Sequence, residues 1–244
     1  MGAGSAVLGC GDTHVCAFSL DLETSILASL ESLLSPDEIA RANRFRLAWE
    51  RARFVAGRAR LRQIVGHYMN RAPESLRFDY SPTGKPSMAP SKGQEPLRFN
   101  ATGSEALALV VLRMDADVGV DIERIRHLPD APALAKRMLS ADEYGEFTSI
   151  PEELQQTRFF EYWTRKEALA KALGSGLQQG FDWLSLHPWP GDKPQRIDCS
   201  RGGETVPQWV MPIAVPRKGY IAAHAAAIPF GLVRVQWWDP RTTR

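Results

Sequence analysis

The sequence predicts an α+β fold in which two stretches of the chain each run from helices into strands. In the first stretch, a helical pattern covers about residues 35–68, and strand patterns follow between residues 76 and 122. In the second stretch, a helical pattern covers about residues 152–173, and strand patterns continue to residue 238. A chain of 244 residues is long enough for one large domain or two small ones with ample core.

The first stretch has a clear helix start at Ser35. Ser35 suits the N-cap, Pro36 the first helical position, and Glu38 the capping-box partner three residues on. The helical pattern then continues, with at most one break, and its expected core positions are Phe45, Trp49, Leu61, Ile64 and Val65. Around this helix we expect a strand at 15–20, a short helix near 22–34, strands at 76–80, 97–100, 106–113 and 118–122, and a Pro- and Gly-rich loop at 81–96.

The second stretch repeats the capping pattern at Ser140 and Glu143. A long helix is expected over residues 152–173, ended by Gly174 at the C-terminal cap. The strands expected after it lie at 181–186, 209–214, 220–226 and 232–238.

Composition excludes several classes of protein. The formal net charge is only +2 and no run of eighteen apolar residues occurs, so neither an overall basic partner-binding surface nor a membrane span is expected. The first residues lack the basic region of a signal peptide. The three cysteines show no metal or redox spacing, and the five histidines show no ligand or Ser-His-Asp pattern. We therefore expect a cytoplasmic protein with reduced thiols.

The most informative segment is Gly-Val-Asp-Ile-Glu at 119–123, which has the pattern of a strand ending in two carboxylates. Side chains alternate along a strand, so Asp121 and Glu123 point to the same face. Taken alone, this pattern is also typical of a sheet rim that runs into a turn. Oxygen ligands suit a hard cation, and Mg²⁺ usually takes one or two carboxylates together with water and substrate phosphate.

A second segment, Trp-Thr-Arg-Lys-Glu-Ala-Leu-Ala-Lys at 163–171, has the pattern of a helix. Glu167 and Lys171 share one face at i and i+4, and Lys166 lies to one side. An exposed ion pair would give the same spacing. Together with the first segment, three carboxylates and two lysines are what a site needs to hold Mg²⁺ against a diphosphate.

The two segments together resemble the signatures of the 4′-phosphopantetheinyl transferase superfamily. Two further segments resemble its longer, surfactin-synthetase-activating branch: Thr-Gly-Lys-Pro at 83–86, and Phe-Asn-Ala-Thr-Gly-Ser at 99–104, where that branch has Phe-Asn-Leu-Ser-His-Ser. The helix start at 35–38 and the arginines after it are also similar. The resemblance runs from about residue 13 to about residue 238.

The resemblance implies a pseudo-dimer of two α/β halves, 1–115 and 116–244, each with a mainly antiparallel sheet on a long helix and with the active site in the cleft between them. It implies transfer of the 4′-phosphopantetheine arm of coenzyme A to a serine of an apo acyl or peptidyl carrier protein, by a monomer. The implied Mg²⁺ (or Mn²⁺) ligands are Asp121, Glu123 and Glu167, with Glu167 as general base and Lys171 on the diphosphate. The implied coenzyme A contacts are Arg41, Arg53, Lys85, Thr102, Gly103, Asp121, Lys166 and Lys171.

Two other functions stay open at this stage. One is a coenzyme A or carrier-protein binding module with impaired catalysis, which the departure at Gly103 keeps in view. The other is nucleic-acid binding by the arginine-rich stretch at 41–62. The chain has neither a recognisable nucleic-acid motif nor a basic excess, so we expect no nucleic-acid partner.

Overall fold

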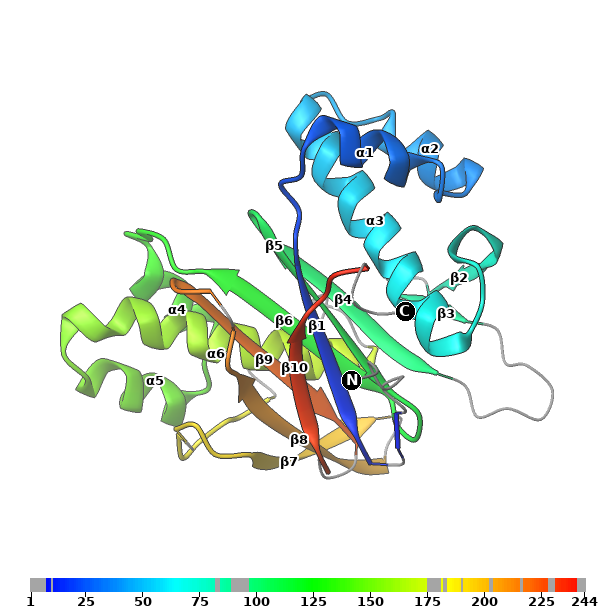
Figure 1. The fold of residues 1–244 in the computed structure, drawn as a ribbon. Helices are drawn as coiled ribbons and strands as arrows, with labels where there is room; N and C mark the ends of the chain where they lie inside the picture. Colours follow the sequence, from blue (N-terminus) through cyan, green and yellow to red (C-terminus); the bar gives the residue numbers. More distant parts are fainter. Residues whose placement is uncertain are drawn as a thin grey trace, which may run out of the picture.

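The computed structural model describes residues 8–9, 11–81, 84–88, 97–174, 181, 184–189, 191–201, 204–215, 217–227 and 231–240. Figure 1 shows its elements in chain order. The first half contains β1 (Thr13–Ser19), α1 (Thr24–Glu31), α2 (Pro36–Ala42), α3 (Ala48–Met69), the short 3₁₀ helix η1 (Pro73–Ser75), β2 (Phe78–Tyr80), β3 (Pro86–Met88), β4 (Arg98–Ser104) and β5 (Leu107–Arg113). The second contains β6 (Val118–Arg124), α4 (Ala131–Met138), α5 (Ala141–Ser149), α6 (Glu152–Leu173), β7 (Gln195–Arg201), β8 (Glu204–Ile213), β9 (Tyr220–Ala226) and β10 (Val233–Trp237).

The strands form two four-stranded sheets and one small hairpin. The first sheet has the order β10-β1-β5-β4, the second has the order β6-β9-β8-β7, and β2 pairs with β3. All of the paired strands are antiparallel except β1 and β10, which are parallel. The α+β prediction, with mainly antiparallel sheets on long helices, is confirmed.

The last strand does not follow the expected division at residue 115. β10 belongs to the second half of the sequence, yet it pairs with β1 in the first sheet, with Thr13 opposite Val233. The chain therefore returns to its starting sheet, and residues 233–237 are part of the first structural unit.

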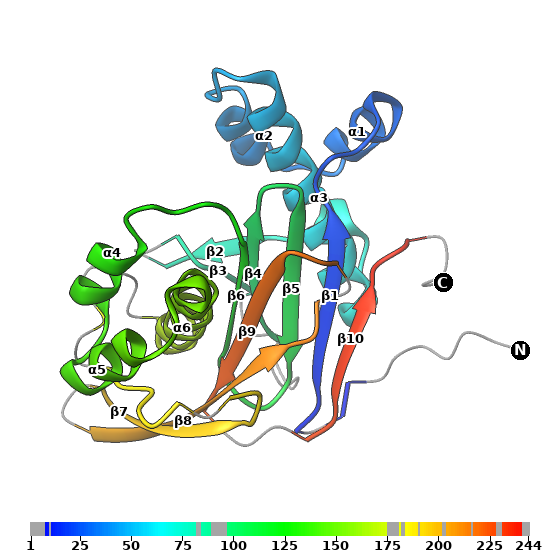
Figure 2. The same ribbon diagram turned by 90° about the vertical axis from the view of Figure 1, so that its left-hand side faces the viewer.

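Three apolar clusters hold the layers together. Between the sheets, Val15 and Leu109 of the first pack with Val120 and Ala222 of the second. On the outer face of the first sheet, α3 packs through Leu61 and other residues onto β1, β4 and β5. The outer face of the second sheet is covered by α6, which lies against β6 and β9 (Figure 2). The layer order is thus α3, first sheet, second sheet, α6.

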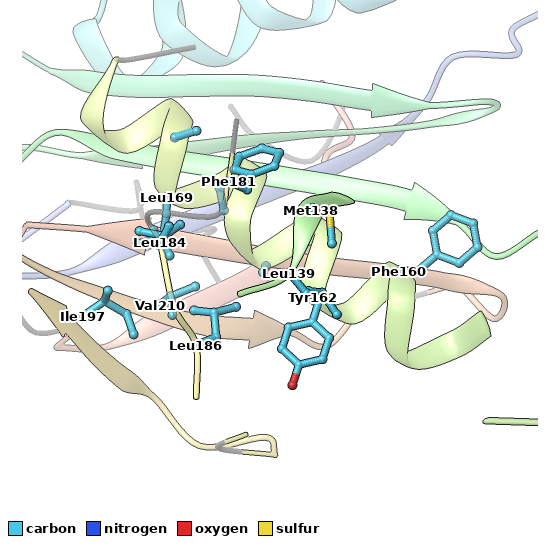
Figure 3. Packing of buried hydrophobic residues seen from close by; sticks show 14 of the residues in the cluster. Met138, Leu139, Phe160, Tyr162, Leu169, Phe181, Leu184, Leu186, Ile197 and Val210 are labelled. Atoms are coloured by element: carbon cyan, nitrogen blue, oxygen red, sulfur yellow. The ribbon is translucent and has the colours of Figure 1, made fainter. Parts of the chain in front are cut away.

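The cluster around α6 is large and aromatic. Figure 3 shows part of it, where Tyr162 and Leu169 of α6 lie near Met138 of α4 and Val210 of β8. All four side chains are buried. Such a core fixes the position of α6, and with it the side chains that α6 presents to β6.

Several boundaries agree with the sequence and several differ. The helix over 152–173, its Gly174 cap in left-handed conformation and the strand over 220–226 are confirmed. Residue 181 and residues 184–186 lie outside the strands, so the strand expected there is wrong, and β7 and α4 were not predicted. Phe45 and Trp49 are 37% and 55% exposed, contrary to expectation; Phe45 lies at 43–47, where the chain leaves the helix, and Trp49 lies in the first turn of α3. No helix in the described residues is long and apolar enough to cross a membrane.

Candidate active site

Gly119 brings β6 and α6 into direct contact. A Cβ atom at this position would lie 2.1 Å from the carbonyl oxygen of Ala168 and 2.4 Å from the amide nitrogen of Ala172. No side chain fits in that space, so only glycine lets the strand lie this close to the helix backbone. The glycine of the first motif thereby places Asp121 of β6 beside the face of α6 that carries Lys171.

Asp121 is buried and only partly neutralised. Its Oδ1 accepts hydrogen bonds from Lys171 Nζ at 2.6 Å and from Thr102 Oγ1 at 3.1 Å. Its Oδ2 is buried and accepts no hydrogen bond. Burial raises the pKa of Asp121, while Lys171 lowers it and Glu123 raises it. One oxygen of Asp121 is therefore available for a further partner.

Glu167 is also buried, and its Oε1 accepts no hydrogen bond. Burial raises the pKa of Glu167 to about 7; Lys171 opposes this shift, and the charges of Asp121 and Glu123 add to it. The three carboxylates predicted from the two motifs thus act on one another electrostatically. Glu123 itself accepts from Ser104 Oγ at 2.9 Å and lies 3.6 Å from Arg126 Nη1.

A cavity of about 600 Å³ lies next to this site, although none of the three carboxylates is among the residues that line it. Thr102 connects the two, because it lines the cavity and its hydroxyl bonds both Asp121 and Lys171. Gly103, which follows Thr102 in β4, also lines the cavity, as do Arg41 and Arg53. The remaining lining residues are Phe18, Leu20, Phe45, Trp49, Glu50, Phe54, Gly57, Arg58, Leu61, Gly84, Pro86, Ala101, Glu105 and Ala108.

Arg41 and Arg53, two of the implied coenzyme A contacts, both lie at this cavity. Arg53 pairs with Asp21, with Nε 2.6 Å from Oδ1, and its guanidinium lies 5.1 Å from the Trp49 ring. Arg41 lies 5.4 Å from the Phe54 ring. Another arginine of the stretch at 41–62, Arg62, is buried and bonded to Glu38 and to two backbone carbonyls.

Lys85 lies in a different environment from the one predicted. Its ammonium donates to the carbonyls of Lys171 at 2.7 Å and Val118 at 3.2 Å, while its neighbours Gly84 and Pro86 line the cavity. The side chain of Lys85 therefore ties the first half to α6 and β6, and it is the neighbouring residues Gly84 and Pro86 that line the cavity.

The prediction that Lys166 contacts coenzyme A is wrong. Lys166 is fully buried, and its ammonium donates to Glu143 Oε2 at 2.7 Å and to the carbonyls of Leu184, Phe181 and Met138. Adjacent residues on a helix are turned by about 100°, so Lys166 faces α5 while Glu167 faces β6. Its bonds hold α4, α5, Phe181 and Leu184 against α6.

Comparison with known proteins gives the family. The profile described as "4′-phosphopantetheinyl transferase superfamily" matches residues 117–223. The 4′-phosphopantetheinyl transferase HetI of Nostoc sp. is 36% identical over 230 residues, which cover 94% of this chain and 91% of that protein. The 4′-phosphopantetheinyl transferase psf-1 of Bacillus pumilus is 35% identical over 64% of each chain, and AcpT of Escherichia coli K12 is 34% identical over 53% of this chain and 61% of that protein.

The chain belongs to the 4′-phosphopantetheinyl transferase superfamily. The HetI match extends over both sheets, in agreement with the longer branch that the sequence resembles. The protein is therefore a 4′-phosphopantetheinyl transferase, and members of this superfamily generally use Mg²⁺ and coenzyme A.

The carboxylates of this transferase fit a hard divalent cation in their chemistry. All of the donors are oxygens, and Asp121 Oδ2 and Glu167 Oε1 are buried without a hydrogen bond, which leaves them for an ion. In the described parts of the chain, no group of three His, Cys, Asp or Glu side chains is already close enough together to coordinate a metal ion. This agrees with Mg²⁺ chemistry, in which substrate phosphate and water complete the shell.

Two residues that the sequence did not single out also contact this site. Ser104 bonds Glu123, and Asn100 Oδ1 accepts from the amide of Val120 at 3.0 Å. Both lie in the Phe-Asn-Ala-Thr-Gly-Ser segment, spaced by two with Thr102. That spacing puts the three side chains on one face of β4, and it was the one available signal.

Proposed function

We propose that this protein transfers the 4′-phosphopantetheine arm of coenzyme A to a serine hydroxyl of an apo acyl or peptidyl carrier protein and releases adenosine 3′,5′-bisphosphate. The observation that carries the proposal is the position of Thr102, which lines the arginine-rimmed cavity and bonds both Asp121 and Lys171. A ligand that fills the cavity would therefore end at the carboxylates. A monomer that acts in the cytoplasm is the setting we expect, where the buried thiols of Cys16 and Cys199 stay reduced.

The cavity suits the nucleotide end of coenzyme A. Guanidinium groups grip phosphates through paired hydrogen bonds, and Arg41 and Arg53 lie at the cavity wall. The small residues Gly57, Gly103 and Ala108 also line the cavity and leave room for a ligand. We assign Arg41, Arg53, Thr102 and Gly103 to coenzyme A binding on these grounds.

The carboxylates Asp121, Glu123 and Glu167 would hold Mg²⁺, or Mn²⁺ in its place. The chemistry that such an ion would supply there is neutralisation of the negative charge that develops on the leaving phosphate. Lys171 pairs with Asp121 Oδ1, and from there its positive charge would add to that of the ion.

In the reaction, the serine oxygen of the carrier protein forms a bond to the phosphorus that bears the pantetheine arm. The anhydride bond to the second phosphorus breaks, and adenosine 3′,5′-bisphosphate leaves with the electron pair. Glu167 is the proposed acceptor of the serine proton, through the carboxylate oxygen that is not assigned to the ion. Lys171 stabilises the negative charge on the leaving group.

Glu167→Gln tests the role of this carboxylate. The protein is incubated with coenzyme A, Mg²⁺ and a panel of apo carrier proteins, and the intact mass of each carrier shows whether the arm was added. We expect Glu167→Gln to lower the transfer rate by roughly a hundredfold or more, as loss of a general base does. Glu153→Gln, an exposed change on the same helix, is the matched control and should leave the rate unchanged.

The same variant has a second expected result that does not depend on activity. Glu167 is buried among like charges, so replacing it by glutamine should leave the metal-free protein at least as stable as before. Thermal unfolding in a chelator measures this. Unfolding of Glu167→Gln, or full transfer activity in it, would contradict the assignment. Coenzyme A binding without any transfer by the wild type would favour an impaired binding module.

A further inference from the structure

The facing edges of the two sheets are joined by side chains. β4 is the edge strand of the first sheet and β6 is the edge strand of the second. Asn100 accepts from the amide of Val120 at 3.0 Å, and Ser104 Oγ accepts from the amide of Arg124 at 3.1 Å. Each bond spans twenty residues of sequence, so the two strands run side by side in the same direction.

Side chains on the same face of β4 also donate hydrogen bonds to the two carboxylates of β6. Thr102 Oγ1 donates to Asp121 Oδ1 at 3.1 Å, and Ser104 Oγ donates to Glu123 Oε2 at 2.9 Å. β4 thus supplies one residue that holds the β6 backbone just before Asp121, and another that holds it just after Glu123. The row made by Asn100, Thr102 and Ser104 is continuous along one face of β4.

The geometry at Ser104 fixes the direction of its hydroxyl proton. An amide N–H can only donate, so the hydroxyl oxygen accepts from Arg124 and turns its own proton to Glu123. Glu123 also has a cationic neighbour, because Arg126 Nη1 lies 3.6 Å from its Oε2. Half of the Arg126 side chain is exposed, so this ion pair constrains the Glu123 carboxylate only weakly. Ser104 is therefore the short, directed contact of Glu123.

We propose that Ser104 is a positioning residue that orients Glu123 toward the ion-binding side shared with Asp121 and Glu167. This inference rests on the proposed function, because it assumes that these carboxylates hold the metal. Groups that hydrogen-bond a metal ligand fix its orientation, and their loss typically costs about 10- to 100-fold in metal affinity. Ser104 belongs to the first sheet and Glu123 to the second. The relative position of the two sheets therefore affects the orientation of the metal ligands.

Ser104→Ala and Ser104→Thr test the proposal, with Mn²⁺ as the probe. Electron paramagnetic resonance counts free Mn²⁺ during titration of the full chain in the presence of coenzyme A. We expect Ser104→Ala to raise the Mn²⁺ dissociation constant about tenfold, and Ser104→Thr, which keeps the hydroxyl, to stay near wild type. Ser29→Ala removes a hydroxyl that bonds only the Ile26 carbonyl on α1, and it is the matched control.

The steady-state constants give an independent readout. The Michaelis constant for coenzyme A at saturating metal should stay unchanged in Ser104→Ala, while the metal concentration needed for half-maximal rate rises. A loss of stability alone would leave both constants of the folded fraction unchanged. If Ser104→Ala does not fold, Ser104→Cys replaces it in the same titration, because a thiol keeps the volume but is only a weak donor.

The outcomes separate this inference from the proposed function. Wild-type Mn²⁺ affinity in Ser104→Ala would overturn the role of Ser104, provided that Asp121→Ala loses Mn²⁺ binding. Equal losses in Ser104→Ala and Ser104→Thr would also overturn it, because the hydroxyl would then not be the cause. If Asp121→Ala keeps Mn²⁺ binding, the metal site assigned under the proposed function is wrong, whatever the Ser104 variants show.

Discussion

Gly103 is the residue at which this chain departs from the pattern of its branch, which has histidine at that position. Gly103 is exposed and lines the cavity. A Cβ atom added there would lie 3.2 Å from Leu20 Cδ1 and 3.4 Å from the carbonyl oxygen of Leu107. The first of these contacts is with the flexible end of a side chain, so a histidine can be accommodated if Leu20 shifts slightly.

We expect Gly103→His to lower the Michaelis constant for coenzyme A by up to about tenfold and to change the turnover number less. One charge-assisted hydrogen bond to phosphate is worth about 1.5–3 kcal/mol, and crowding against Leu20 offsets part of it. The contact lies at the nucleotide end and is made equally in the ground and transition states. Steady-state kinetics measure both constants. Gly103→Ala reports the crowding alone, and a turnover number that changed as much as the Michaelis constant would contradict the assignment.

At the scale of elements, Lys166 and Glu143 join three helices around one buried ion pair. Glu143 caps α5 through the Ser140 amide and also accepts from the amide of Leu186 at 2.6 Å. Lys166 supplies the balancing charge, and both side chains are fully buried. Removing one partner of a buried pair leaves an uncompensated charge in the core.

Lys166→Met should therefore destabilise the protein by about 3–5 kcal/mol, as seen when buried pairs are broken. Urea unfolding followed by circular dichroism measures the change. Lys136→Met, at an exposed position on α4, should change stability by no more than about 0.5 kcal/mol. A small effect of Lys166→Met, together with a raised Michaelis constant for coenzyme A, would return Lys166 to the binding site.

The sequence predicted elements better than it predicted partners. Helix α6 and its Gly174 cap follow from local pattern, and so does the shared face of Glu167 and Lys171. Lys166 was misplaced because its partner Glu143 lies 23 residues away on another helix, which no periodicity reveals. Ser104 was missed for the same reason, since its two partners belong to the other sheet.

For the whole molecule, buried histidine links stability to pH. His224 of β9 is fully buried, and burial, with a smaller contribution from Arg113, lowers its pKa to about 3 from an ordinary value of 6.5. The neutral form is thus favoured in the folded state. Below pH 6.5 the unfolded chain takes up a proton that the folded chain does not, so the free energy of unfolding falls with pH down to about 3. The raised pKa of Glu167 acts in the opposite direction between about 7 and 4.5.

Comparison with His224→Leu isolates the histidine from these other groups. Between pH 7 and pH 5, the wild type should lose about 2 kcal/mol more unfolding free energy than the variant. Urea unfolding in a chelator at both pH values gives the two differences. Equal losses in the two proteins would mean that His224 can be protonated within the fold.

The oligomeric state follows from where the site residues originate. Arg53 and Thr102 of the first half and Asp121, Glu167 and Lys171 of the second come from one chain, so no second copy is needed to complete the site. We predict a monomer, and light scattering after gel filtration should give a mass near 27.1 kDa across a range of concentrations.

The surface through which copies of this chain would most readily associate is β10. It is an edge strand, and its side chains Val235 and Trp237 are 36% and 48% exposed. Edge strands with exposed apolar side chains pair readily with other chains. A dimer mass that returned to the monomer value in Trp237→Lys would show that β10 associates, and the monomer prediction would be wrong. An obligate trimer with a shared active site would contradict the site assignment as well as the monomer prediction. It would mean that the cleft within one chain is not where transfer occurs. A constant monomer mass with full transfer activity in both wild type and Trp237→Lys is the expected result, because β10 lies on the opposite edge of the first sheet from β4 and contributes nothing to the carboxylates.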